Sequence, residues 1–102
     1  MIKSELIATL IKRQPDMAPE DVELAVNCLL EKFSEELAAG KRIEIRGFGS
    51  FSLHQFSARQ ARNPNTGEPV LTPAKARVHF KPGNQLRNRV NDSRDQYSIS
   101  RE

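Results

Sequence analysis

The chain has too few cysteines for the disulfides of secreted proteins, and it lacks the long apolar runs of membrane proteins. Its 102 residues include a single cysteine, Cys28, so no internal disulfide can form. No apolar run is long enough to span a bilayer, and Met1–Ser4 lead directly into a helical pattern without a signal peptide. These absences predict a soluble protein of a reducing, cytoplasmic compartment. We expect Cys28, which lies in the second predicted helix, to be a small core residue.

The residue sets that carry catalysis are missing as well. We find no nucleophile–base pair, no phosphate-binding loop and no paired carboxylates, so we expect no enzyme and no cofactor. His54 and His79 lie far apart without companions at ligand spacing, which argues against a metal site. The one tyrosine lies near the C-terminus and the phenylalanines follow core spacing, so the chain lacks an aromatic platform for stacking bases.

The charge of +3 is modest, but it is unevenly distributed along the chain. Residues 55–90 hold seven lysines and arginines against one acid, a net of +6. Residues 19–36 hold six acids against one lysine, a net of −5. This segregation predicts one surface for a polyanion and another that stays in water.

Two helices are predicted in the first 40 residues. Apolar residues recur at helical spacing from Lys3 to Arg13, and Pro15 ends that helix. The start of the helix has no capping box. Pro19 opens the second helix and Gly40 closes it. Its apolar stripe consists of Val22, Ala25, Val26, Leu29, Leu30, Phe33 and Leu37. Leu24 and Cys28 widen the apolar surface beyond this stripe, which predicts a second chain packing there.

Strands follow from residue 42. Ile43 and Ile45 alternate with polar residues, and the segment 47–49 turns the chain into a second alternating strand. A long arm is predicted over about 56–77, with a return strand and a last short helix that begins at Pro82–Gly83 and turns Leu86 and Val90 inward. The expected fold class is α+β, with too small a core for a stable monomer.

The arm tip is the most informative segment. Arg59 and Arg62 lead to Pro64, and residues 65–67 supply the turn chemistry of a hairpin. Few apolar residues surround this segment, so it has no core of its own. A basic ribbon that ends in a rigid apolar ring is suited to enter a groove of nucleic acid.

The chain resembles the HU and integration host factor family of bacterial DNA-bending proteins over residues 1–91. The resemblance rests on Gly47–Phe51, on the Arg-Asn-Pro-x-Thr-Gly motif of 62–67 and on Phe80–Gly83. Within the family, residues 42–54 are most similar to beta subunits of integration host factor. The resemblance implies an HU-like intertwined dimer with a helical base, a three-stranded sheet and one β-ribbon arm per subunit. The partner subunit would be an alpha-type subunit or a second copy.

The resemblance also implies roles for individual residues. Pro64 would be the wedge inserted between base pairs, with the preceding arginines in the minor groove. The helix N-termini near Gly83 and near Lys3 would bind phosphates. The residues expected to contact double-stranded DNA are Arg42, Glu44, Arg46, Arg59, Arg62, Asn63, Pro64, Lys75, Arg77, Lys81, Gly83, Lys3 and Ser4. Ala61 departs from the family, which usually has glycine there, so a positive φ would be strained.

Arg42, Glu44 and Arg46 form a distinctive trio on the first strand. An acid between two arginines is unfavourable in an indiscriminate DNA binder, because it repels phosphate. We interpret Glu44 as holding Arg46 in one rotamer that reads the groove, against the alternative of a weak surface ion pair.

The implied function is sharp bending of duplex DNA at preferred sites, in recombination, transcription control and nucleoid organisation. The alternatives are an HU-like homodimer that packages DNA without sequence preference, a binder of RNA or single strands, and a protein-interaction scaffold. Residues 92–102 are polar and are predicted to be a disordered tail outside the DNA-binding domain of 1–91.

Overall fold

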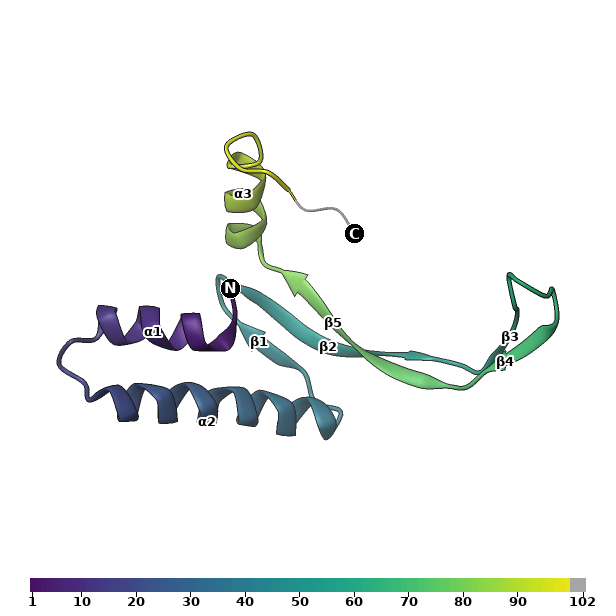
Figure 1. The fold of residues 1–102 in the computed structure, drawn as a ribbon, viewed down its shortest axis with the longest axis horizontal. Coiled ribbons are helices and arrows are strands. Elements are labelled where there is room, and N and C mark those ends of the chain that lie inside the picture. Colours follow the sequence, from purple (N-terminus) through teal and green to yellow (C-terminus); the bar gives the residue numbers. More distant parts are fainter. Residues whose placement is uncertain (100–102) are drawn as a thin grey trace.

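The computed structural model describes residues 1–99 as an elongated molecule with a helical end, a central sheet and a projecting ribbon (Figure 1). The elements in order are α1 (Lys3–Arg13), α2 (Pro19–Ala38), β1 (Ile43–Ile45), β2 (Gly49–Phe56), β3 (Arg59–Arg62), β4 (Pro69–Thr72), β5 (Lys75–Pro82) and α3 (Asn84–Asp92). Strands β1, β2 and β5 form an antiparallel sheet in the order β1-β2-β5, and β3 pairs with β4. The predicted α+β class is confirmed.

The first helix begins where the sequence pattern placed it, but Glu5 contributes a cap that the sequence reading missed. Its Oε2 accepts a hydrogen bond from the Ile2 backbone N–H at 3.2 Å. Ile2, in the N-cap position, has no side-chain acceptor, so only this half of a capping box can form. The start of α1 is therefore fixed by one carboxylate and by the intrahelical bonds.

The second helix has both of the predicted end signals. Pro19 occupies its first turn, where a missing N–H costs nothing. At the other end, Gly40 N–H donates to the Leu37 carbonyl and Lys41 N–H donates to the Glu36 carbonyl, both at 3.0 Å. This pair of bonds is the Schellman pattern that ends a helix at a glycine.

The core of the single chain is small. Among residues 1–99, only Val22 and Val26 are buried apolar side chains, at 4% and 8% exposure. A row of four phenylalanine rings joins α2 to the sheet, with centroid distances of 5.8, 4.8 and 5.4 Å along Phe33, Phe51, Phe80 and Phe48. Gly49 is necessary for this packing, because a Cβ there would lie 2.7 Å from the Phe80 ring.

Several residues predicted to face a core are exposed in this chain. Leu29 and Leu30 of the α2 stripe are 56% and 41% exposed, Cys28 is exposed, and Val90 of α3 is 57% exposed. The placement of Cys28 and Val90 in the core was therefore wrong for the single chain. The radius of gyration is 19.2 Å, whereas a compact domain of this length has about 13 Å.

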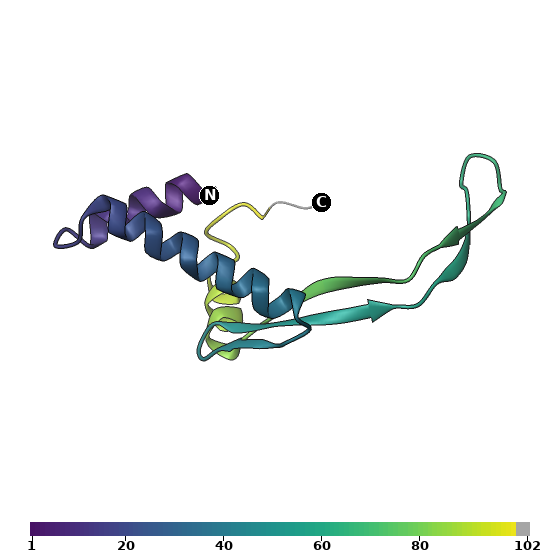
Figure 2. The same cartoon turned by 90° about the horizontal axis from the view of Figure 1, so that it is seen from below.

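The arm is one antiparallel ribbon with a break in its ladder. The β2–β5 pairing ends at Phe56 opposite Lys75, and the β3–β4 pairing resumes in the same register with Arg59 opposite Thr72. Pro73 lies in the gap and has no N–H to donate, which accounts for the break. The ribbon changes direction beyond the gap (Figure 2).

Two further expectations concern the arm and the chain end. Ala61 lies in β3 opposite Val70, and no non-glycine residue of the range 1–99 has a positive φ, so the anticipated strain is absent. Helix α3 extends to Asp92, and turns follow through residue 96. Residues 100–102 of the predicted tail lie outside the described residues. No helix within 1–99 is long and apolar enough to cross a membrane.

Candidate nucleic-acid interface

One face of the three-stranded sheet collects the polar and basic side chains. Alternation along β2 and its pairing with β5 set the members of this face, which we call the basic face. It consists of Ser50, Ser52, His54 and Phe56 with their cross-strand partners Lys81, His79, Arg77 and Lys75. Glu44 of β1 pairs with Ser50 and extends the same face. The structure thus brings together three predicted DNA contacts of β5 that are separated in the sequence.

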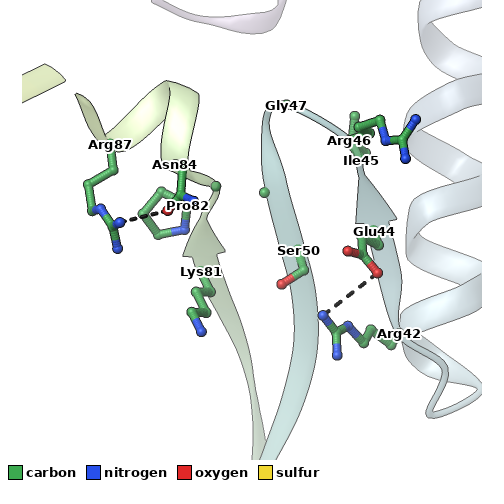
Figure 3. Close-up of a pocket in the computed structure, with 12 residues that line it drawn as sticks. Arg42, Glu44, Ile45, Arg46, Gly47, Ser50, Lys81, Pro82, Asn84 and Arg87 are labelled. Atoms are coloured by element: carbon green, nitrogen blue, oxygen red, sulfur yellow. Dashed lines mark hydrogen bonds and ion pairs between the residues drawn. The ribbon is translucent and has the colours of Figure 1, made fainter. Parts of the chain in front are cut away.

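A groove of about 700 Å³ lies at the end of the basic face, between the sheet and the start of α3 (Figure 3). Its lining includes the predicted residues Arg42, Glu44, Arg46, Lys81 and Gly83. Asn84 and Arg87 also line it and were not predicted. Arg87 Nη2 donates to Asn84 Oδ1 at 2.6 Å, which holds the guanidinium near the N-terminus of α3. The position of Arg87, one turn after Gly83, was the signal that sequence analysis passed over.

The ion pair on β1 differs from the predicted one. Glu44 Oε2 lies 3.8 Å from Arg42 Nη2, and both side chains are largely exposed. Figure 3 shows Arg46 pointing away from Glu44, and no ion pair to Arg46 occurs within residues 1–99. The interpretation that Glu44 holds Arg46 was therefore wrong. Side chains two residues apart on a strand share a face, so Glu44 had two equivalent neighbours and pairs with the earlier one.

The arm tip is organised by its own side chains. Asn63 Oδ1 accepts from the Asn65 N–H at 2.9 Å, which is an Asx turn. The Asn63 N–H donates to the Glu68 carbonyl at 2.8 Å, and the Gly67 N–H donates to the Asn63 carbonyl at 2.7 Å. Asn63 was predicted to contact DNA. One lone pair of Oδ1 is engaged in this turn, so the side chain can still present its amide N–H groups and the second lone pair outward.

Arg62 and Gly67 complete this tip. Arg62 Nη1 donates to the Gly67 carbonyl at 3.2 Å and so ties the guanidinium across the loop. Gly67 adopts φ +74°, a conformation that a side chain would strain. Pro64 lies at the turn with an exposed ring. The tip therefore presents a rigid apolar ring on a preformed turn, with basic side chains directly behind it.

At the base of the arm, an exposed aromatic ring orients an arginine. Arg77 Cζ lies 4.8 Å from the centroid of Phe56, whose residue is 44% exposed. A guanidinium over an aromatic face is a favourable cation–π contact that restricts the side chain. Phe56 was not predicted to have a role. The alternation Ser-Ser-His-Phe along β2 could have indicated that Phe56 lies on the polar face of the sheet.

The two histidines contact each other, contrary to the sequence reading that kept them apart. Their rings are stacked at a centroid distance of 4.2 Å with 16° between planes. Pairing of β2 with β5 places His54 opposite Arg77 and His79 opposite Ser52, so the histidines are diagonal neighbours on the basic face. Within residues 1–99, no cluster of three or more potential ligand side chains could hold a metal ion.

Lys3 and Ser4 are not brought into this group. They begin α1, which stands apart from the sheet in the second view (Figure 2).

The shifted pKa values lie away from the basic face, on α2. There, the hydrogen bond from Lys32 to Glu36, at an N–O distance of 3.0 Å, raises the pKa of Lys32 and lowers that of Glu36. The interface carries lysine and arginine side chains, whose positive charge suits a polyanion.

Comparisons with known proteins agree with this arrangement. Residues 1–91 match the family model described as bacterial DNA-binding protein. Integration host factor subunit beta of Halorhodospira halophila is 64% identical over 96 residues, which is 94% of each chain. The same subunit of Pseudomonas aeruginosa is 54% identical over 92 residues, covering 90% of this chain and 98% of the relative.

Solved structures of similar fold point the same way. The HU–DNA cocrystal structure from Anabaena superposes with a TM-score of 0.77 at 29% identity, covering 88% of this chain and 97% of the other. HU from Thermotoga maritima gives a TM-score of 0.59 at 30% identity, covering 88% and 98%. The resemblance seen in the sequence is confirmed: the chain belongs to the HU and integration host factor family of bacterial DNA-binding proteins.

Proposed function

We propose that this protein is an architectural DNA-binding protein that bends duplex DNA sharply with two minor-groove arms. The observation that carries the proposal is the arm tip, where an exposed Pro64 stands on a preformed turn behind which Arg59 and Arg62 lie. Architectural proteins, among them HU and integration host factor, unstack base steps with apolar wedges of this kind. Proline suits the task because its ring is apolar and already rigid, so little conformational entropy is lost on insertion.

The working unit is a dimer. Leu24 and Leu29 of α2 and Val78 of β5 are 62%, 56% and 58% exposed in the single chain. Burying one such side chain contributes about 1.5–3 kcal/mol, and a core with two buried valines cannot stabilise a chain of this length alone. A second subunit, either an alpha-type subunit or another copy, would cover these residues and bring a second arm.

The basic face and the groove supply the remaining contacts. Lys75, Arg77 and Lys81 would bind phosphates along the path between the arm and the body. The free N–H groups at the start of α3 and the Arg87 guanidinium would bind a phosphate in the groove. Arg46 would reach into a DNA groove and provide sequence preference. Bent DNA reaches more of these cations, which offsets the few kcal/mol of unstacking.

Titration of labelled duplex DNA at a series of salt concentrations tests this function. About ten neutralised phosphates per dimer predict a slope of log affinity against log salt near −9. An equal concentration of single-stranded DNA should compete poorly. A slope near zero would favour a protein-interaction scaffold, and effective competition by single strands would favour a single-strand binder.

A further inference from the structure

The stacked histidines of the basic face are a paired group that the contacts above leave without a role. Both are exposed, and their rings lie parallel at 4.2 Å on the surface that also carries the lysines and arginines of β5. Histidine is also the side chain that changes charge between about pH 5 and pH 8.

The charges around the pair are mostly positive. Arg77 of β5 is opposite His54, and Lys81 follows His79 by two residues on the same face. From β1, Arg42 precedes Ile43 and so falls at the register position beside Ser52, with its carboxylate partner Glu44 at 3.8 Å. β2 contributes the uncharged Ser52 between His79 and β1. The acidic side chain on the basic face is thus Glu44, and its carboxylate is paired with Arg42.

We propose that His54 and His79 form a proton-linked phosphate site, so that DNA binding by this protein is accompanied by uptake of protons at the pair. The inference rests on the proposed DNA-binding function and adds a contact and a pH dependence to it. A phosphate at the edges of the two rings accepts hydrogen bonds from imidazolium N–H groups and stabilises the protonated form. Without the anion, two adjacent imidazolium rings repel each other beside Arg77. Binding and protonation therefore favour each other, and affinity rises as the pH falls through the range of histidine titration.

The test is a titration of labelled duplex DNA with the full chain at about pH 6 and about pH 8, at constant ionic strength. We expect the wild type to bind about tenfold more tightly at the lower pH, within the coupling that two linked ligands typically show. The variant H54Q/H79Q keeps hydrogen-bonding side chains but cannot take a charge. It should bind at both pH values with the wild-type affinity of about pH 8.

A second variant, H79K, carries a permanent charge at the site. It should bind tightly at both pH values, which separates a lost charge from a damaged surface. Calorimetry in two buffers of different ionisation enthalpy should show protons taken up on binding by the wild type and fewer by H54Q/H79Q. Circular dichroism of each variant checks that the fold is kept, as expected for exposed positions.

Three outcomes would overturn the inference. Wild-type binding that is tight but independent of pH would reject it and leave the DNA-binding function in place. A pH dependence retained in H54Q/H79Q would assign the proton to another group, such as the Met1 amine, which lies 3.9 Å from Glu5. An absence of duplex binding at both pH values would reject the proposed function itself, and this inference with it.

Discussion

The helical body leaves leucines exposed on α2, whereas the arm exposes arginines and a proline on a ribbon with no core beneath it. The body exposes apolar side chains of the kind that a subunit interface buries. Leu24 and Leu29 are more than half exposed, because nothing in the single chain packs on them. The arm is held by ladder hydrogen bonds and by the tip bonds of Arg62 and Asn63. The body therefore lacks a partner that buries its apolar side chains, and the arm lacks a partner that neutralises its positive charge.

This difference indicates two separable partners. An apolar surface is completed by another protein surface, because burial is non-directional and scales with area. A basic ribbon is completed by a polyanion, because counterion release needs charge rather than area. Changes in the body should therefore act on assembly, and changes in the arm should act on DNA at unchanged assembly.

The largest effect is expected from L29E in the body. The side chain is 56% exposed in the single chain, so the substitution costs little there, but a dimer would bury an unpaired carboxylate. We expect subunit dissociation constants to rise at least about 1,000-fold, equivalent to roughly 4 kcal/mol. Sedimentation equilibrium measures this directly. S34E adds the same charge to another side of the same helix and should leave the dimer intact; equal dissociation of both variants would refute the assigned interface.

A smaller effect is expected from R59A/R62A in the arm. Losing the four arm arginines of a dimer should weaken duplex binding about 100-fold, equivalent to roughly 2.7 kcal/mol. The salt slope should fall in magnitude by about four per dimer. Sedimentation should show an unchanged dimer. Q60A alters the exposed residue between them and serves as the control. If the double variant keeps the wild-type slope, the arm does not meet phosphates.

The smallest effect is expected from E44A on β1. Because Glu44 pairs with Arg42 at 3.8 Å, its removal frees a cation and takes a carboxylate away from phosphate. Affinity should rise about threefold on every duplex, in line with the small energy of an exposed pair. Titrations on a selected site and on a scrambled site would measure it, with R46A as the variant that loses discrimination. Loss of discrimination in E44A itself would restore the link between Glu44 and Arg46.

The sequence predicted local structure well where one residue decides the outcome. Pro19 begins α2, where its missing N–H costs nothing, and Gly40 ends it with a Schellman turn. The basic residues of β5 were also found, because alternation and charge suffice to identify them. The Arg-Asn-Pro motif placed the tip correctly.

The failures concern contacts between strands and between chains. His54 and His79 are 25 positions apart, and only the pairing of β2 with β5 makes them neighbours. Glu44 had an arginine on either side, and rotamer choice, which no pattern encodes, decided between them. Cys28 was read as core because helical spacing reports apolarity and does not say which chain covers it.

The proposed function requires that Pro64 bends DNA by insertion at the arm tip. Energy transfer between dyes on the two ends of a short duplex measures the bend at saturating protein. We predict strong transfer with the wild type and transfer close to that of free DNA with P64A, although P64A still forms dimers and binds the duplex. Equal transfer with both proteins, each shown to be saturating, would show that Pro64 is not the wedge.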